Sequence, residues 1–291
     1  MTTPSAGRRV WWGTEDVSVR FGNTLALDHV WFRAEPGQVS AVVGGDGAGR
    51  TTLLRCLAGA LAPTSGRVRR PGPLATGYLS AGSGTYPDLS VAENLAFRAA
   101  AYRVPPETAR QRTAELLARA GLDKVTGRLA GQLSGGMRQK LGVIAAMVHR
   151  PDLLVLDEPT TGVDPVSRAD LWLLITRAAA DGAAVVIATS YLDEAERARH
   201  VLVLDAGSEL ASGTADQIVA TMQGTLTVTG TRPAGEAGRR AWRREGRWRV
   251  WDPDPAPSAA GGTVRPDLQD AVTVAALARE LARSGAEGES R

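Results

Sequence analysis

A glycine-rich run between a strand pattern and a helix pattern is the feature that most constrains how this chain folds. β-Branched and apolar residues at 39–43 precede the run, and apolar residues at helical spacing follow it at 51–60. The run itself is Gly44-Gly45-Asp46-Gly47-Ala48-Gly49-Arg50-Thr51-Thr52. A strand that enters a helix through such a turn is a unit of α/β architecture, in which helices cover a mostly parallel sheet. We therefore expect an α/β fold.

Short apolar runs alternate with helical patterns along residues 10–222, which we expect to form one domain. The strands that this alternation predicts are residues 17–21, 39–43, 74–79, 153–156, 183–188 and 200–204. The predicted helices are residues 51–60, 91–103, 107–120, 135–149 and 165–180. Because residues 153–156 are all apolar, they fit a strand buried on both faces of a parallel sheet. Helical patterns crowd residues 86–145, which predicts a helical subdomain inserted into the alternation.

The pattern changes after residue 222 and predicts a small C-terminal appendage at residues 223–291. Within it we expect a strand at 225–229, a loop at 252–262, a helix at 268–281 and disorder from 284 onward. Arginines and tryptophans interleave at residues 239–251. This Arg/Trp tract has two interpretations. It is either a surface that binds a nucleic-acid backbone with base stacking, or a hairpin whose tryptophans pack on the preceding domain.

Composition limits the other classes of protein. No stretch has the roughly 20 apolar residues that a membrane-spanning helix needs, and the polar N-terminus has no apolar signal core. We therefore expect a cytoplasmic protein that reaches a membrane only through a partner. Cys56 is the only cysteine, which excludes an internal disulfide and predicts a small core residue. The histidines are scattered and show no metal-ligand spacing.

The glycine-rich run matches the phosphate-binding pattern G-x-x-x-x-G-K-[ST], with Gly44 and Gly49 at its glycine positions. Curled amides and a helix N-terminus would hold phosphate oxygens, and Thr51 would place its hydroxyl on Mg²⁺. Arg50 stands where the pattern has lysine, and a planar guanidinium does not replace a compact ammonium at a shaped site. Nucleotide binding would survive this change while transition-state geometry suffers. The alternatives are a tight turn without a ligand, and a drift toward arginine in a chain that is almost free of lysine.

Two further motifs carry a resemblance to a known family. Residues 133–137 read Leu-Ser-Gly-Gly-Met, similar to the signature LSGGQ, and Asp157-Glu158 ends an apolar run as a Walker B strand does. With these motifs the chain resembles the ATP-binding-cassette (ABC) ATPases over residues 17–220, which implies a P-loop NTPase cassette that binds ATP and Mg²⁺. The resemblance implies that Thr51 and Asp157 hold Mg²⁺ and that Glu158 polarises the attacking water. It assigns nucleotide contacts to Phe21, residues 44–52, Ser134, Gly135 and Gly136.

Several of these residues also fit purely structural roles. Ser134 could simply cap a helix, and Asp157-Glu158 could be a solvated acidic turn. Asp164 before Pro165 fits both the D-loop of the family and an ordinary helix start. Phe21 is either an adenine-stacking ring or a core aromatic, and the sequence does not separate these two.

Three positions depart from the family pattern. Arg50 replaces the P-loop lysine, Ala81 replaces the Q-loop glutamine, and Ser190 replaces the switch histidine, which contacts the γ-phosphate. The family pairs two cassettes head to tail, so that each ATP lies between one P-loop and the other chain's signature. The resemblance therefore implies a degenerate site on this chain, an intact signature for a partner's site, and a heterodimer with a second cassette.

Residues 86–95, 191–196 and 265–271 look most like the cassettes of ABC-2 type exporters, which pair with separate polytopic membrane subunits. This resemblance implies a peripheral protein at the cytoplasmic face of the cell membrane. An importer is less consistent with the short appendage. Two other functions stay open: an ABC ATPase that acts on ribosomes or nucleic acid, and a scaffold that binds ATP without turnover.

Overall fold

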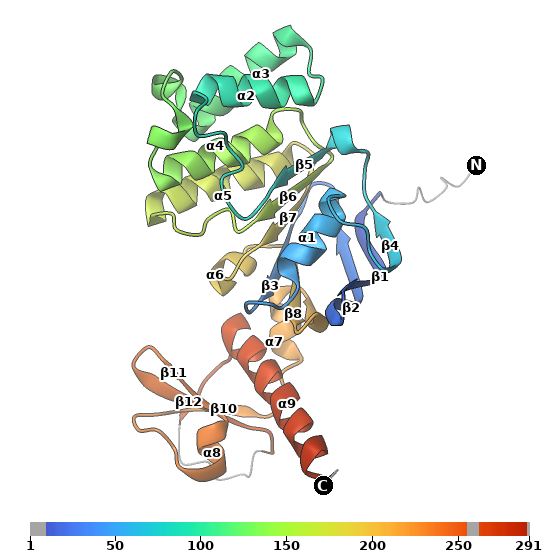
Figure 1. Ribbon diagram of the computed structural model, residues 1–291. Helices are drawn as coiled ribbons and strands as arrows, with labels where there is room; N and C mark the ends of the chain where they lie inside the picture. Colours follow the sequence, from blue (N-terminus) through green and yellow to red (C-terminus); the bar gives the residue numbers. More distant parts are fainter. Residues whose placement is uncertain (1–9, 255–261, 290–291) are drawn as a thin grey trace, which may run out of the picture. The chain divides into compact units, whose positions relative to one another are not determined.

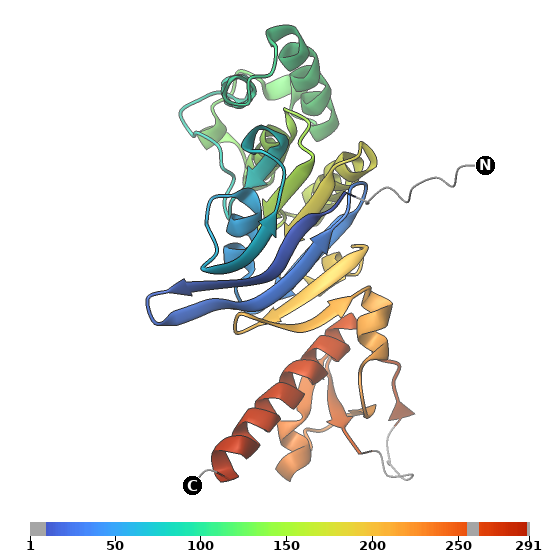
Figure 2. The same cartoon turned by 90° about the vertical axis from the view of Figure 1, so that its right-hand side faces the viewer.

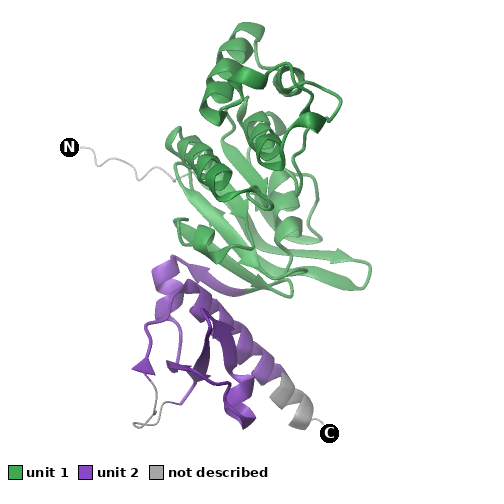
Figure 3. Cartoon of the chain, turned by 90° about the vertical axis from the view of Figure 1, so that its left-hand side faces the viewer, with its two compact units in different colours: residues 1–209 green, residues 210–291 purple. Residues whose placement is uncertain are grey.

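The computed structural model describes residues 10–254 and 262–289. It divides into two compact units, residues 1–209 and residues 210–291 (Figure 3). This boundary falls earlier than the change of pattern expected after residue 222.

The first unit is built on a parallel sheet with the strand order β5-β6-β7-β3-β8 (Figure 1). Its strands are β3 (Val39–Gly44), β5 (Thr76–Leu79), β6 (Leu153–Asp157), β7 (Ala184–Ala188) and β8 (His200–Asp205). All of β6 and β7 is buried, which explains why these strands are apolar at nearly every position. The mostly parallel sheet expected from the sequence is confirmed.

One face of this sheet packs on helix α1 (Arg50–Ala58), which follows β3 directly. An antiparallel sheet of β1 (Trp12–Phe21), β2 (Thr24–Ala34) and β4 (Ser65–Arg69) joins the same core (Figure 2). Alternate strand residues such as Val155 meet Leu53 and Leu57 of α1 there. Cys56 belongs to this core, as its apolar surroundings predicted. The sequence did not predict β2 or β4, and residues 73–75, next to the start of β5, form a 3₁₀ turn.

The opposite face packs on α4 (Gly135–Met147) and α5 (Pro165–Ala180). The inserted helical part also contains α2 (Val91–Ala101) and α3 (Pro106–Ala120), with 3₁₀ turns at Asp123–Val125 and Ala130–Gln132. Helix α6 (Leu192–Ala195) follows β7. Asp164 caps α5 by accepting bonds from the amides of Val166 and Ser167, so the predicted helix start is confirmed.

The second unit combines a small sheet, in the order β11-β12-β10-β13, with a long helix. Its elements after β9 (Ser208–Gly213) are α7 (Ala215–Ala220), β10 (Thr225–Thr229), α8 (Gly235–Arg239), β11 (Ala241–Arg244), β12 (Arg247–Asp252), β13 (Gly262–Thr263) and α9 (Leu268–Glu289). Leu226, Trp251 and Val274 form its core. Helix α9 continues to Glu289, so the prediction of disorder from residue 284 was wrong. Most of the loop predicted at 252–262 lies outside the described residues.

Candidate nucleotide-binding site

The glycine loop between β3 and α1 has a backbone that only glycine adopts easily. Gly47 has φ 76° and Gly49 has φ 103°. A Cβ on Gly49 would lie 2.6 Å from the carbonyl oxygen of Ala26. Gly49 is also the N-cap of α1 and offers no side chain to the first amides of that helix. These amides are therefore free of a side-chain cap, as an anion site at a helix start requires.

Asp157, Glu158 and Ser190 gather next to this loop because Asp157 ends β6, Glu158 follows it, and Ser190 follows β7. Parallel strands place all their carboxyl ends at one edge of the sheet. β7 lies between β6 and β3 in the sheet. The loops after these three strands are therefore neighbours, and Arg50 contacts Glu158 although the two are 108 positions apart in the chain.

Arg50 forms an ion pair with Glu158 through its Nη1 atom and the Oε1 atom of the carboxylate. The two side chains are only 12% and 19% exposed, so water screens this pair poorly. Nη2 of Arg50 also lies 3.9 Å from Oδ1 of Asp46. The cation that replaces the family's lysine is thus directed at acidic groups of its own chain.

The second carboxylate oxygen of Glu158 is occupied as well. Oγ1 of Thr161 donates to Oε2 over 2.7 Å, and the amide and hydroxyl of Ser190 reach the same atom at 3.4 and 3.5 Å. Glu158 has φ 50°, a strained value for a non-glycine residue. The carbonyl oxygen of Glu158 accepts a bond of 3.3 Å from Nε2 of Gln139. Neither Gln139 nor Thr161 belongs to a motif that could be identified from the sequence.

Asp157 has the surroundings of a cation ligand. It is 1% exposed, and its Oδ2 atom has no hydrogen-bond partner among the described residues. Burial raises the pKa of this carboxyl, and a hydrogen bond from Thr51 and the charge of Arg50 oppose the rise. A buried carboxylate oxygen without a partner beside a threonine hydroxyl fits the oxygen-rich coordination of Mg²⁺. Asp157 and Thr51 are the residues that would hold it.

Two other sequence-predicted positions lie at the rim. Phe21 is 50% exposed at the end of β1, so its interpretation as a core aromatic was wrong. Its place as an adenine-stacking ring stays a prediction. Ala81 is exposed just after β5 and has no side-chain group that could bind water or a cation.

The signature forms the start of α4. The hydroxyl of Ser134 accepts a bond of 3.3 Å from the amide of Met137 and caps the helix, as the structural alternative predicted. A Cβ on Gly136 would lie 2.9 Å from Oγ of Ser167, so α4 and α5 approach closely here. Among the described residues, no hydrogen bond or ion pair joins residues 134–136 to the glycine loop.

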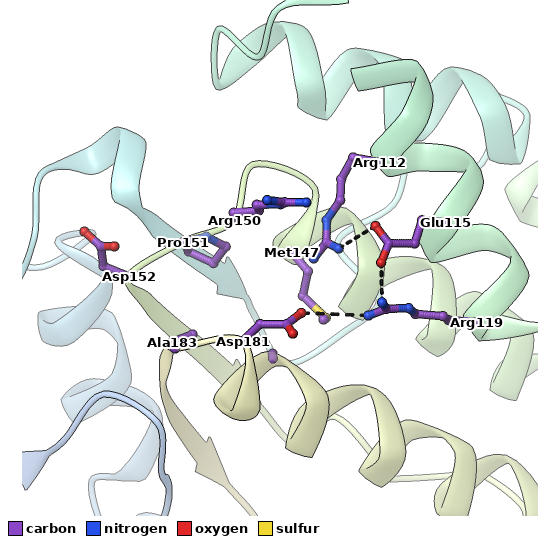
Figure 4. A pocket seen from close by; sticks show the side chains of 11 residues that line it. Arg112, Glu115, Arg119, Met147, Arg150, Pro151, Asp152, Asp181 and Ala183 are labelled. Carbon is purple, nitrogen blue, oxygen red and sulfur yellow. Dashed lines mark hydrogen bonds and ion pairs between the residues drawn. The ribbon is translucent and has the colours of Figure 1, made fainter. Parts of the chain in front are cut away.

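A cavity of about 480 Å³ lies elsewhere, at the amino ends of β6 and β7 (Figure 4). Arg112 and Arg119 of α3 line it, and both pair with Glu115. Arg119 also lies 3.8 Å from Asp181 at the end of α5. Because its acids offset its arginines, the cavity has no clear preference for an ionic ligand. The cavity lies at the edge of the sheet formed by the amino ends of the strands, whereas the glycine loop lies at the edge formed by their carboxyl ends.

Several residues of the Arg/Trp tract pack or form ion pairs within the second unit. Trp251 packs with Leu226 and Val274. Arg244 and Arg249 both pair with Asp270 of α9, which is 0% exposed. The hairpin of the second interpretation is present as β11 and β12, and Trp251 and Trp242 pack in the core of this unit. Trp251 is therefore buried in the core of its own unit and cannot stack on bases.

The glycine loop, the acid pair that ends β6 and the helix cap at α4 together define a P-loop ATPase cassette. Comparisons with known proteins agree: residues 27–161 match the family described as ABC transporter. The daunorubicin resistance ATP-binding protein DrrA3 of Streptomyces coeruleorubidus is 36% identical over 230 residues, which cover 75% of this chain and 73% of that protein. The chain belongs to the ABC transporter family.

Two further comparisons support this assignment. The probable multidrug ABC transporter ATP-binding protein YbhF of Escherichia coli is 44% identical over 198 residues, or 65% of this chain. The match spans only 34% of YbhF, about a third of its length. A solved structure titled as the ATP-binding subunit of an ABC transporter covers 72% of this chain and 92% of its own, with 26% identity and a TM-score of 0.68. Within the described residues, no helix combines the length and apolar character needed to cross a bilayer.

Proposed function

We propose that this chain is the ATP-binding subunit of an ABC exporter and drives export through separate polytopic membrane subunits. The printed names of its relatives, a multidrug transporter protein and a daunorubicin resistance protein, favour export. The chain would lie at the cytoplasmic face of the membrane. Residues 44–52 bind the phosphates of ATP, Phe21 stacks on adenine, and Thr51 and Asp157 hold Mg²⁺. A bound Mg²⁺ neutralises charge on the phosphates.

The chain's own site is degenerate and weakly active. The ion pair between Arg50 and Glu158 is the observation that carries this proposal. A carboxylate that polarises water needs a free oxygen, yet both oxygens of Glu158 have partners within the chain. Ala81 and Ser190 add to the loss, because neither side chain can replace the family's glutamine or histidine.

The signature supports a second part of the proposal, a heterodimer of cassettes. Ser134 caps α4, and the first two residues of the helix, Gly135 and Gly136, have no side chains. Such a helix start suits a γ-phosphate of another chain. An intact signature beside a degenerate P-loop is useful only to a partner whose own P-loop is sound. Hydrolysis would then occur mainly at the partner's P-loop.

The test is a purified complex of this chain with its membrane subunits and partner cassette. Neutralising the partner's catalytic glutamate should remove most ATP turnover, whereas Glu158→Gln here should remove little. Equal losses would reject the asymmetry. A complex that binds ATP but never turns it over would point to a scaffold. Recovery of ribosomes or nucleic acid in place of membrane subunits would reject the exporter.

A further inference from the structure

Glu194 of α6 is a charged residue in the interior of the first unit. Its side chain is 1% exposed. One oxygen, Oε2, accepts a hydrogen bond of 2.9 Å from Oγ1 of Thr160 and one of 2.8 Å from Oγ1 of Thr189. Hydrogen bonds to an ionised acceptor in a dry interior are roughly twice as strong as neutral ones. A single carboxylate oxygen of Glu194 therefore holds the hydroxyl groups of both threonines.

The two threonines belong to the loops that carry the γ-phosphate end of the site. Thr160 comes two residues after Glu158, and Thr189 comes directly before Ser190. Both threonines are 0% exposed. The amide of Thr189 also donates to the carbonyl oxygen of Val42 over 3.2 Å. Since Val42 is on the strand that leads into the glycine loop, the ends of β6, β7 and β3 are joined around Glu194.

The other oxygen of Glu194 is directed toward α5. Oε1 lies 3.8 Å from Nε of Arg168, and neither atom has a hydrogen-bond partner in the described part of the chain. The guanidinium of Arg168 lies 4.3 Å above the ring of Tyr191. Arg168 offsets the buried charge without competing for Oε2. The carboxylate can therefore serve both threonines.

We infer that Glu194 is the positioning residue that holds Glu158 and Ser190 together at the γ-phosphate end of the nucleotide site. This inference rests on the proposed ATP-binding function. In the described part of the chain, the printed partners of the Glu194 carboxylate are Thr160, Thr189 and Arg168, so Glu194 acts on the site through the two threonines. Without it the loops after β6 and β7 separate, while the glycine loop keeps its shape from its own backbone. Its loss should therefore weaken contacts to the γ-phosphate and spare those to the α- and β-phosphates.

The full chain, with Mg²⁺, is titrated by calorimetry with ATPγS and with ADP. Glu194→Ala should weaken ATPγS binding about tenfold, the effect of losing one charged hydrogen-bond set, while ADP affinity stays within about twofold. Glu194→Gln should restore ATPγS binding, because an amide oxygen accepts both hydroxyl bonds. Glu196→Ala, at an exposed neighbour, is the matched control and should change neither affinity.

A second pair of variants covers the case in which Glu194→Ala does not fold. Thr160→Val and Thr189→Val each remove one hydrogen-bond donor at nearly constant volume. Each should weaken the binding of ATPγS more than the binding of ADP. Thr176→Val on α5, whose hydroxyl bonds only its own helix, should not. Equal loss of ADP and ATPγS binding in these variants would overturn the inference. If the unaltered chain gives no heat with either nucleotide, the proposed function fails instead.

Discussion

Arg50, at the first turn of α1, neutralises Glu158, which follows β6. The pair joins the cation expected to hold phosphate and the carboxylate expected to activate water. A phosphate group that enters the glycine loop competes with Glu158 for the guanidinium. Under the proposed function, binding of a nucleotide therefore breaks this ion pair.

Glu158→Gln should tighten ADP binding about tenfold, because breaking one partly buried charged pair no longer opposes binding. Mant-ADP fluorescence measures this change. A thermal-denaturation cycle with Arg50→Met and the double variant provides the control. Without nucleotide, we expect the stability effects of the two substitutions to be non-additive. At saturating Mg-ADP, we expect these effects to be additive. Additive effects without nucleotide would contradict the pair.

Arg50→Lys, Ala81→Gln and Ser190→His together should raise ATP turnover by at least about tenfold, within the range that one acid-base or electrostatic group contributes. Phosphate release by the complex, with the partner's glutamate neutralised, isolates the activity of this site. Arg50→Lys alone should give a smaller gain, since the γ-phosphate contacts are still missing. No change in the triple variant would mean that another feature limits the site.

Gly136→Ala should destabilise the chain by about 1–3 kcal/mol, the usual cost of overpacking. Its Cβ would meet Oγ of Ser167 at 2.9 Å. ADP binding to the glycine loop should stay unchanged, whereas turnover at the partner's P-loop should fall. Gly127→Ala is the matched control, because nothing lies within 4 Å of a Cβ there. Urea titration and phosphate release give the two readouts.

The partly buried imidazole of His149 should lower the free energy of unfolding in acid. Its ring stacks on Tyr102, and burial lowers its pKa from 6.5 to about 4. Between these values the unfolded chain binds more protons, so the free energy of unfolding falls as the pH drops from 6.5 toward 4. We expect His149→Phe to remove about 2 kcal/mol of this loss, with allowance for partial exposure.

Urea titrations at several pH values measure the acid loss. His29→Gln is the control, because Asp16 raises the pKa of exposed His29 and the variant should keep the acid loss. An unchanged slope in His149→Phe would assign the loss to other groups.

Asp270→Ala should destabilise the second unit by about 3 kcal/mol, because it leaves the partly buried guanidinium of Arg249 without its counter-charge and removes one of the two acidic partners of Arg244. Oδ2 of Asp270 lies 2.5 Å from Arg249, and Oδ1 lies 3.3 Å from Arg244. Faster hydrogen exchange in β10 and β12 would report the change. Asp267→Ala should have a smaller effect, since Asp267 is 39% exposed. Equal destabilisation by the two substitutions would show that burial of the carboxylate does not determine how much stability its removal costs.

Elements with a strong local signal could be predicted closely from the sequence. Helix α5 and strand β10 have the expected bounds, and Asp164 with Pro165 marks the helix start that capping rules require. The glycine loop and the acids after β6 were predictable because each depends on neighbours in sequence. The meeting of Arg50 with Glu158 was not, since tertiary contact alone brings them together.

Other features have no local signal. From the sequence, Glu194 belongs to the segment that resembles the family's switch region, and only its buried threonine partners explain why it lies inside. Strand β2 contains a polar Asp28-His29 step, where His29 has φ 52°, and this bulge breaks the alternation that identifies a strand. Residues 285–289 include two glycines, which are poor helix formers, yet they continue α9.

The positions that depart from the family pattern all lie past the carboxyl end of a strand: Arg50 after β3, Ala81 after β5 and Ser190 after β7. None belongs to the hydrophobic interior, so each could be exchanged without repacking a single apolar side chain. Architecture and reactivity are thus encoded in different sets of residues. Under the proposed function, point substitutions remove the chemistry of such a cassette and can restore it, while its sheet and its helices persist.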